Sequence, residues 1–153
     1  PRLAAYAASQ PGLTFSLVAA DEMLDFTEAN LDVALRLSDR VGEHEGVQLG
    51  EPLFVTVEAA NGGPDQRIEW PGCPSSDQPA SIRVADAGLA IEAAATGFGR
   101  ASVPLLLAEA DLTAGRIRQV GDAVASPLSY WLIAPLPQWR QKKVKALVEA
   151  LTR

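Results

Sequence analysis

Alternation of short β-rich segments with helical segments is the feature that most limits what this chain can fold into. Residues 81–84 predict a strand, and residues 87–95 predict a helix whose first turn Asp86 can cap. A short strand over 101–103 and a further helix follow, and residues 128–134 predict a strong strand. Such alternation favours an α/β fold with mostly parallel sheets that helices cover.

The rest of the chain predicts a similar but less regular pattern. Short runs rich in β-branched residues, and turns rich in Gly and Pro, mark its elements. We expect a helix over residues 1–8, a strand over 13–18, a short acidic helix over 21–30, and strands over 33–37, 47–49, 53–57, 67–70 and 116–120. A final helix over 138–152 places Val144, Leu147, Val148 and Leu151 on one stripe.

Residues 59–78 differ in composition from their surroundings. Turn-forming residues fill Asn61–Asp65 and Pro71–Ser76, and only residues 67–70 between them predict a strand. About twenty residues with so little regular structure are unusual in a compact domain. We therefore expect a mobile segment or an abbreviated second lobe here.

Composition predicts a globular domain, or two small lobes that share a cleft. The 153 residues are 48% hydrophobic and 21% charged, enough to bury a core without disulfides or metals. A net charge of −6 disfavours nucleic-acid binding by this chain, because such binding relies on Lys and Arg that neutralise phosphates. A single cysteine fits a reducing compartment, so a cytoplasmic location is expected. We expect no membrane span and no signal peptide, and a longer protein of which Pro1 is not the start.

Catalytic and metal-binding constellations find little support. His44, the single histidine, lies between two glutamates and could be a base or ligand, but a solvated loop position is the favoured interpretation. One His and one Cys cannot build a typical zinc site, so no metal and no cofactor are expected. Gly97-Phe98-Gly99 is too short for a dinucleotide fingerprint and follows a helix, so it predicts a helix end and a tight turn. The basic residues near the C-terminus are expected to be a solvated helix face, with an anion site as the alternative: Arg140, Lys142, Lys143 and Lys145.

Several stretches, taken in order, resemble one protein family. They are PRLAAYAASQPGLTFSL, DFTEANLDVALRLSD, LGEPLFVTV, IRVADAGLAIEAAATGFGRASVPLLLAEADLTAGRI and SPLSYWLIAP. Together they resemble the effector-binding domain of LysR-type transcription regulators, and most of all the subgroup of the glycine-cleavage activator and the β-lactamase regulator. A family turn of Gly-Asp is Ser38-Asp39 in this chain.

The resemblance implies a two-lobed α/β fold like that of type 2 periplasmic binding proteins. Residues 1–54 and 128–153 would form lobe I, and residues 55–127 lobe II. It implies a non-enzymatic function: a small-molecule effector, expected to be anionic, binds in the cleft between the lobes. A homodimer is implied as well, with DNA contacted only by a helix-turn-helix domain that this chain does not contain. A solute-binding protein of a transport system is the main alternative, and an enzyme on the same scaffold is the third.

The resemblance also implies a set of effector-binding residues. Each has a structural alternative: Tyr130 as a core residue, Asp86 as a helix cap, Ser38 and Asp39 as a turn, and Phe98 as a packing residue. The implied set is Ser38, Asp39, Arg40, Asp86, Ala87, Gly97, Phe98, Gly99, Ser129 and Tyr130. The Ala-rich helices 1–8 and 89–95 are candidate dimer surfaces.

Overall fold

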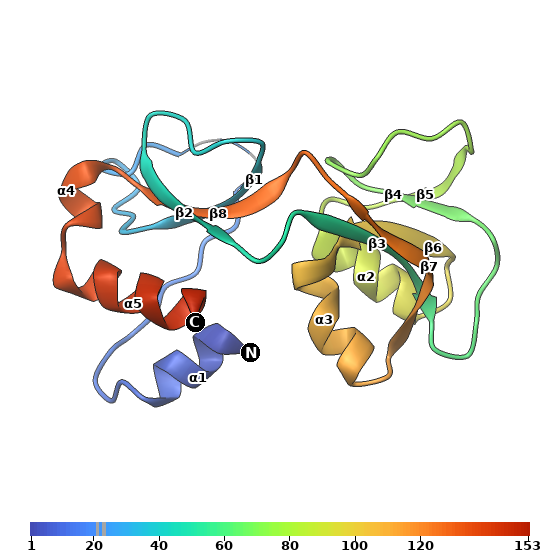
Figure 1. The fold of residues 1–153 in the computed structure, drawn as a ribbon, viewed down its shortest axis with the longest axis horizontal. Coiled ribbons are helices and arrows are strands. Elements are labelled where there is room, and N and C mark those ends of the chain that lie inside the picture. The colour runs from blue at the N-terminus through green and yellow to red at the C-terminus, as the bar shows by residue number, and fades with distance from the viewer. Residues whose placement is uncertain (21, 23) are drawn as a thin grey trace. The chain divides into compact units, whose positions relative to one another are not determined.

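Two compact units make up the chain. The computed structural model describes residues 1–20, 22 and 24–153. Unit 1 comprises Pro1–Gly50 and Leu128–Arg153, and unit 2 comprises Glu51–Pro127 (Figure 1). Each unit has its own sheet and its own helices. Both ends of the chain belong to unit 1, because its two segments are the first and the last parts of the sequence.

Unit 1 is built on a three-stranded antiparallel sheet in the order β1-β8-β2. The strands are β1 (Ala34–Ser38), β8 (Ser129–Ala134) and β2 (Glu45–Leu49). Its helices are α1 (Arg2–Ala8), α4 (Leu136–Trp139) and α5 (Lys142–Thr152), and α1 packs against α5. The predicted stripe of α5 is confirmed, because Val144 is buried and Leu147, Val148 and Leu151 are half-buried.

Phe26 is the centre of the unit 1 core. It is 5% exposed and packs with Ile133 and Ala134 of β8, surrounded by partly buried apolar side chains. The ring of His44 meets the Phe26 ring edge to face, with centroids 5.2 Å apart. His44 therefore lies in the bend before β2, as expected, but it is half-buried against the core and less solvated than the sequence suggested.

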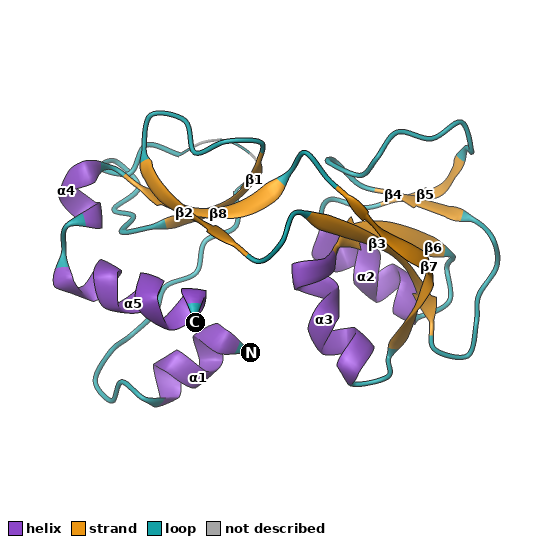
Figure 2. Ribbon diagram, viewed as in Figure 1, coloured by secondary structure: helices purple, strands orange, loops and turns teal. Residues whose placement is uncertain are grey.

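Unit 2 is built on a five-stranded mixed sheet in the order β5-β4-β6-β3-β7. The strands are β3 (Leu53–Ala59), β4 (Arg67–Glu69), β5 (Ala80–Arg83), β6 (Arg100–Pro104) and β7 (Ile117–Ala125). Helices α2 (Ala87–Ala95) and α3 (Leu105–Thr113) contact each other and cover one face of this sheet (Figure 2). Among the described residues, no helix is long and apolar enough to cross a bilayer.

The expectation of mostly parallel sheets is wrong, because most of the strand pairs are antiparallel. In the described strands, only β4 pairs in parallel, with β5 and β6, and the other pairings are antiparallel. A covering helix between two strands of one sheet predicts that the strands run parallel, and β5 and β6, joined by α2, do so on either side of β4. The remaining partners come from distant segments, whose direction the local pattern does not reveal.

Three predicted elements differ in the structure. Residues 13–18 form no strand, and Leu17 is 79% exposed, because no described strand lies beside them to complete a ladder. The described part of the expected acidic helix is a turn over residues 26–30, whereas Asp21 and Met23 lie outside the described residues. The final helix is two helices, because Gln141 has an extended ψ of 138° between α4 and α5.

The alanines of α2 are used within unit 2. Ala90 and Ala94 are 0% exposed, and α2 packs against β3, β4 and β6. Small side chains let the helix approach the fully buried valines of the sheet closely. The suggestion that this alanine face forms a dimer surface therefore does not fit, although Leu89 on the outer side is 50% exposed.

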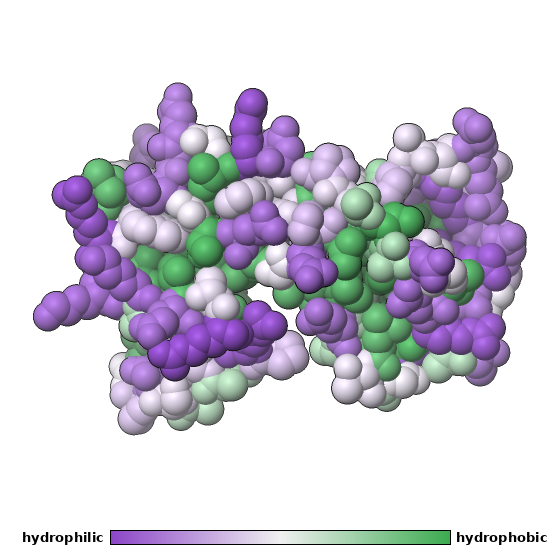
Figure 3. Space-filling view, in the orientation of Figure 1, coloured by the Kyte–Doolittle hydropathy of each residue, from purple (hydrophilic) through white to green (hydrophobic). Residues whose placement is uncertain are grey.

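Opposite the helices, the sheet of unit 2 carries a buried charge. The side chain of Glu58 on β3 is 3% exposed and lies 3.1 Å from Arg100 Nε and 2.7 Å from Arg118 Nη2. Hydrogen bonds from Arg118 and Arg100 lower the pKa of the Glu58 carboxyl below its ordinary value of 4.5. In Figure 3, hydrophilic side chains dominate the right-hand margin of unit 2, and apolar side chains gather nearer its middle.

Substitution of Glu58 with glutamine is expected to lower the melting temperature by roughly 5 °C at pH 7. A lowered folded-state pKa stabilises the fold above pH 4.5, and this stabilisation is lost as the pH falls through the folded pKa. The difference between wild type and variant should therefore shrink below pH 4.5, as measured by thermal unfolding from pH 7 to pH 3. Glu109→Gln, an equal charge change at an exposed site, serves as the control, and a difference that stays constant with pH would contradict the assignment.

Candidate functional site

In unit 1, antiparallel pairing brings together two segments far apart in the sequence. Ser38 ends β1 directly opposite Ser129, which begins β8. The indole Nε1 of Trp131 donates to the Ser38 carbonyl at 3.2 Å and holds this end of the sheet. Ser129 is 8% exposed, and Tyr130 beside it is half-buried, with Leu37 and Leu49 as its partners in the register. Four of the predicted residues therefore share one edge of unit 1: Ser38, Asp39, Ser129 and Tyr130.

Asp39 and Arg40 form the turn that follows β1. The Ser38 hydroxyl lies 3.4 Å from Asp39 Oδ1 and accepts from the Arg40 backbone N–H at 3.4 Å. Arg40 Nε lies 4.0 Å from Asp39 Oδ1, and both side chains are largely exposed. An exposed pair at this distance adds little stability. The Arg40 guanidinium is thus exposed and only weakly paired.

In unit 2, Asp86 is a helix cap. Its Oδ1 accepts from the Leu89 backbone N–H at 2.8 Å, at the start of α2, as the sequence predicted. Ala87 beside it is 3% exposed. The Asp86 carboxylate already satisfies the α2 N-terminus, so it reduces the attraction of that terminus for an anionic ligand.

Gly97, Phe98 and Gly99 lie at the opposite end of α2 from Asp86. The Phe98 N–H donates to the Ala93 carbonyl, and the Gly97 N–H donates to the Ala94 carbonyl. This pair of hydrogen bonds is the Schellman motif that ends a helix. The nine residues of α2 span about 13 Å, so the structure does not bring this loop together with Asp86 and Ala87. Phe98 is 54% exposed, so the interpretation of this side chain as a packing residue is wrong.

Two pockets lie outside the predicted residues. One, of about 360 Å³, is in unit 1 beside His44 and is lined by Leu24, Asp25, Phe26, Thr27, His44 and Pro135. The other, of about 410 Å³, is in unit 2 and contains Arg67, Glu69 and Arg83. The sequence held one signal for the second pocket, since Arg67 and Glu69 alternate on a predicted strand. Within the described residues, no three His, Cys, Asp or Glu side chains converge on a metal site.

Comparison with solved structures identifies the fold. The effector domain of the transcriptional regulator AmpR of Pseudomonas aeruginosa matches with a TM-score of 0.74 and 20% identity, over 99% of this chain and 85% of that chain. The AmpR effector-binding domain of Citrobacter freundii gives 0.74 and 16%, over 98% and 87%. The regulatory domain of CrgA, a LysR-type transcriptional regulator of Neisseria meningitidis, gives 0.72 and 13%, over 97% and 89%. No protein-family model matches the sequence, and comparison with curated proteins gives no relative.

These likenesses confirm the predicted fold class. The chain has the α/β fold of LysR-type effector-binding domains, a type 2 periplasmic-binding-protein-like fold, with two sheets. Full-length AphB of Vibrio cholerae, a member of the LTTR protein family, matches 99% of this chain, and the match covers 62% of AphB. At 13–20% identity the likeness concerns the fold, and the subgroup of the glycine-cleavage activator stays a prediction.

Proposed function

We propose that this chain is the ligand-binding regulatory domain of a LysR-type transcription regulator, and not an enzyme. One observation carries the proposal: effector and regulatory domains of transcription regulators from three bacteria match between 97% and 99% of the chain. The order of sequence segments that resemble the family supports the same function independently. The protein would act in the cytoplasm, where its DNA lies.

The effector-binding residues that we propose lie in unit 1. Ser38, Ser129 and Tyr130 carry hydroxyl groups near one end of strands β1 and β8, and Arg40 adds an exposed positive charge. Hydroxyls and a guanidinium suit a small polar or anionic effector. In unit 2, Asp86 caps the N-terminus of α2 and the loop Gly97–Gly99 ends the same helix.

Regulation would follow from a shift in conformational population. An effector that binds one conformation more tightly than another favours it by the difference in its affinities. We propose that this shift changes how a homodimer holds DNA, through a helix-turn-helix domain that is not among these 153 residues. The negative charge of the present chain supports this division of labour, because it leaves DNA contact to another domain.

Thermal unfolding with a panel of amino acids and small carboxylates tests the proposal on the product of the complete gene. We expect one class of compound to raise the melting temperature and, at the same concentration, to change binding to DNA fragments from upstream of the same gene. A product that binds a compound but no DNA would contradict the regulator and favour a solute-binding protein. A product that converts the compound would contradict both in favour of an enzyme.

Substitution of Tyr130 with phenylalanine is expected to weaken the binding of that compound about threefold to tenfold. Loss of one hydroxyl removes one hydrogen bond and keeps the ring. Isothermal titration measures the change. Tyr6→Phe, at the second of the two tyrosines, is the matched control, because Tyr6 lies on α1 and packs against Phe15. Equal affinities of the two variants would remove Tyr130 from the site.

A further inference from the structure

The pocket of unit 2 lies under the connection between β4 and β5. Its volume is about 410 Å³, which is in the range of small-molecule sites. Its lining comes entirely from unit 2 and shares no residue with the effector set proposed above. The lining residues are Arg67, Glu69, Trp70, Pro71, Cys73, Ser75, Arg83 and Val84.

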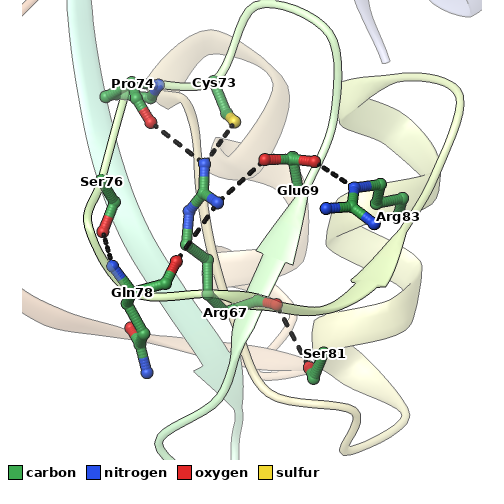
Figure 4. Close-up of polar contacts among 8 residues, drawn as sticks. All are labelled: Arg67, Glu69, Cys73, Pro74, Ser76, Gln78, Ser81 and Arg83. Carbon is green, nitrogen blue, oxygen red and sulfur yellow. Dashed lines mark hydrogen bonds and ion pairs between the residues drawn. The ribbon is translucent and has the colours of Figure 1, made fainter.

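Arg67 is the largely buried arginine of this pocket, and several contacts hold its side chain in place. Its side chain is 15% exposed, and its Nη1 donates to Glu69 Oε1 at 2.9 Å. Its other contacts, to Cys73 Sγ, Pro74 O and Gln78 O, reach the connecting loop at 3.4–3.5 Å (Figure 4). Arg67 therefore ties the loop of residues 73–78 to the sheet and keeps the pocket formed.

Arg83 is the second positive charge of the pocket. Its Nε donates to Glu69 Oε2, so Glu69 lies between the two arginines (Figure 4). Among the described residues, neither terminal nitrogen of Arg83 has a hydrogen-bond or ion-pair partner, and the side chain is 76% exposed. Two guanidinium groups and one carboxylate leave a net charge of +1.

The remaining wall is apolar and rigid. Trp70 is 4% exposed, its Nε1 donates to the Ser102 carbonyl at 2.8 Å, and its ring stacks on Phe54. Pro71 and Val84 continue this wall. A ligand that complements the pocket therefore has one negative charge for Arg83 and a small apolar body for Trp70, Pro71 and Val84.

We propose that this pocket binds a small monocarboxylate, with its carboxylate paired to the terminal nitrogens of Arg83 and its apolar body against Pro71, Val84 and the small exposed part of Trp70. The planar guanidinium fork matches a carboxylate in two parallel hydrogen bonds. The site goes beyond the proposed regulatory function. It is formed by unit 2 alone, and its test does not depend on whether the chain regulates transcription.

Phenylacetate and its neutral isostere phenylacetamide are the probes that test the site on the whole chain. Two-dimensional amide NMR at constant ionic strength should show phenylacetate binding with a Kd on the order of 1 mM, with shifts confined to residues 67–84. Phenylacetamide should bind at least about fivefold more weakly, because it carries no charge for Arg83. Equal binding of the two, or no binding up to about 20 mM, would overturn the proposal.

Two substitutions should change this affinity in opposite directions. Arg83→Gln should weaken phenylacetate binding about fivefold, and its exposed position protects the fold. Glu69→Gln should tighten it about threefold, because a competing carboxylate is removed from Arg83. Arg116→Gln is the control of equal charge, since Arg116 pairs with Glu92 and Asp111 outside the pocket. An Arg83 variant that behaves like the Arg116 variant would overturn the site.

Cys73 supplies an independent readout. It is the one cysteine of the chain and lines the pocket, so mass spectrometry of its alkylation by N-ethylmaleimide reports on this place alone. Phenylacetate near saturation should slow the alkylation, and phenylacetamide at equal concentration should not. Shifts that cluster at Ser38, Ser129 and Tyr130 instead would overturn this pocket and leave the proposed regulatory function standing.

Discussion

The substitution Gly99→Ala is expected to destabilise unit 2 by roughly 3 kcal/mol. Gly99 has a φ of +151°, and an added Cβ would lie 2.3 Å from the Gln66 carbonyl oxygen, which belongs to the backbone. That oxygen also accepts the Arg100 N–H at 2.7 Å, so it cannot move away without loss of a hydrogen bond beside β4 and β6. Urea unfolding followed by circular dichroism, with amide exchange in unit 2, measures the change.

Gly97→Ala is the matched control for this prediction. Gly97 is two residues away and has a φ of +95°, but nothing lies within 4 Å of its Cβ position. Its substitution should cost about 1 kcal/mol, from the backbone conformation alone. If the two variants were equally stable, the close approach of Gly99 to Gln66 would not be a determinant of this fold.

The substitution Phe54→Ala is expected to lower the free energy of unfolding by about 3–5 kcal/mol, because it removes a buried aromatic side chain and leaves a cavity. Phe54 is 2% exposed and its ring stacks on Trp70 with centroids 6.1 Å apart. Loss of that support should also loosen Trp70 and weaken phenylacetate binding in the neighbouring pocket. Chemical unfolding measures the first effect, and the phenylacetate titration described above measures the second.

Val124→Ala provides the comparison within the same strand pair. Val124 is the register partner of Phe54 on β7, yet it is 55% exposed. Its truncation should change the free energy of unfolding by no more than about 0.5 kcal/mol. A similar loss for both variants would mean that burial does not decide the contribution of this pair.

Part of the candidate site was predictable because it depends on local chemistry. Asp86 was expected to cap a helix, and a turn-forming pair of glycines was expected after that helix, since both depend on residues a few positions apart. The pairing of Ser38 with Ser129 follows from a register between β1 and β8, which no local pattern specifies. The pocket around Arg83 depends in the same way on how β4 and β5 align.

The amino-acid sequence by itself determined the class of fold, most of the strands and helices, and the apolar stripe of α5, because period and capping are local properties. Only the tertiary structure decided the antiparallel pairing around β3 and β8, and the absence of a strand over residues 13–18. It also decided that His44 packs on Phe26 and that Arg67, Glu69 and Arg83 meet in one pocket. These features depend on contacts between segments distant in the chain, and such contacts are set by the burial of the whole unit.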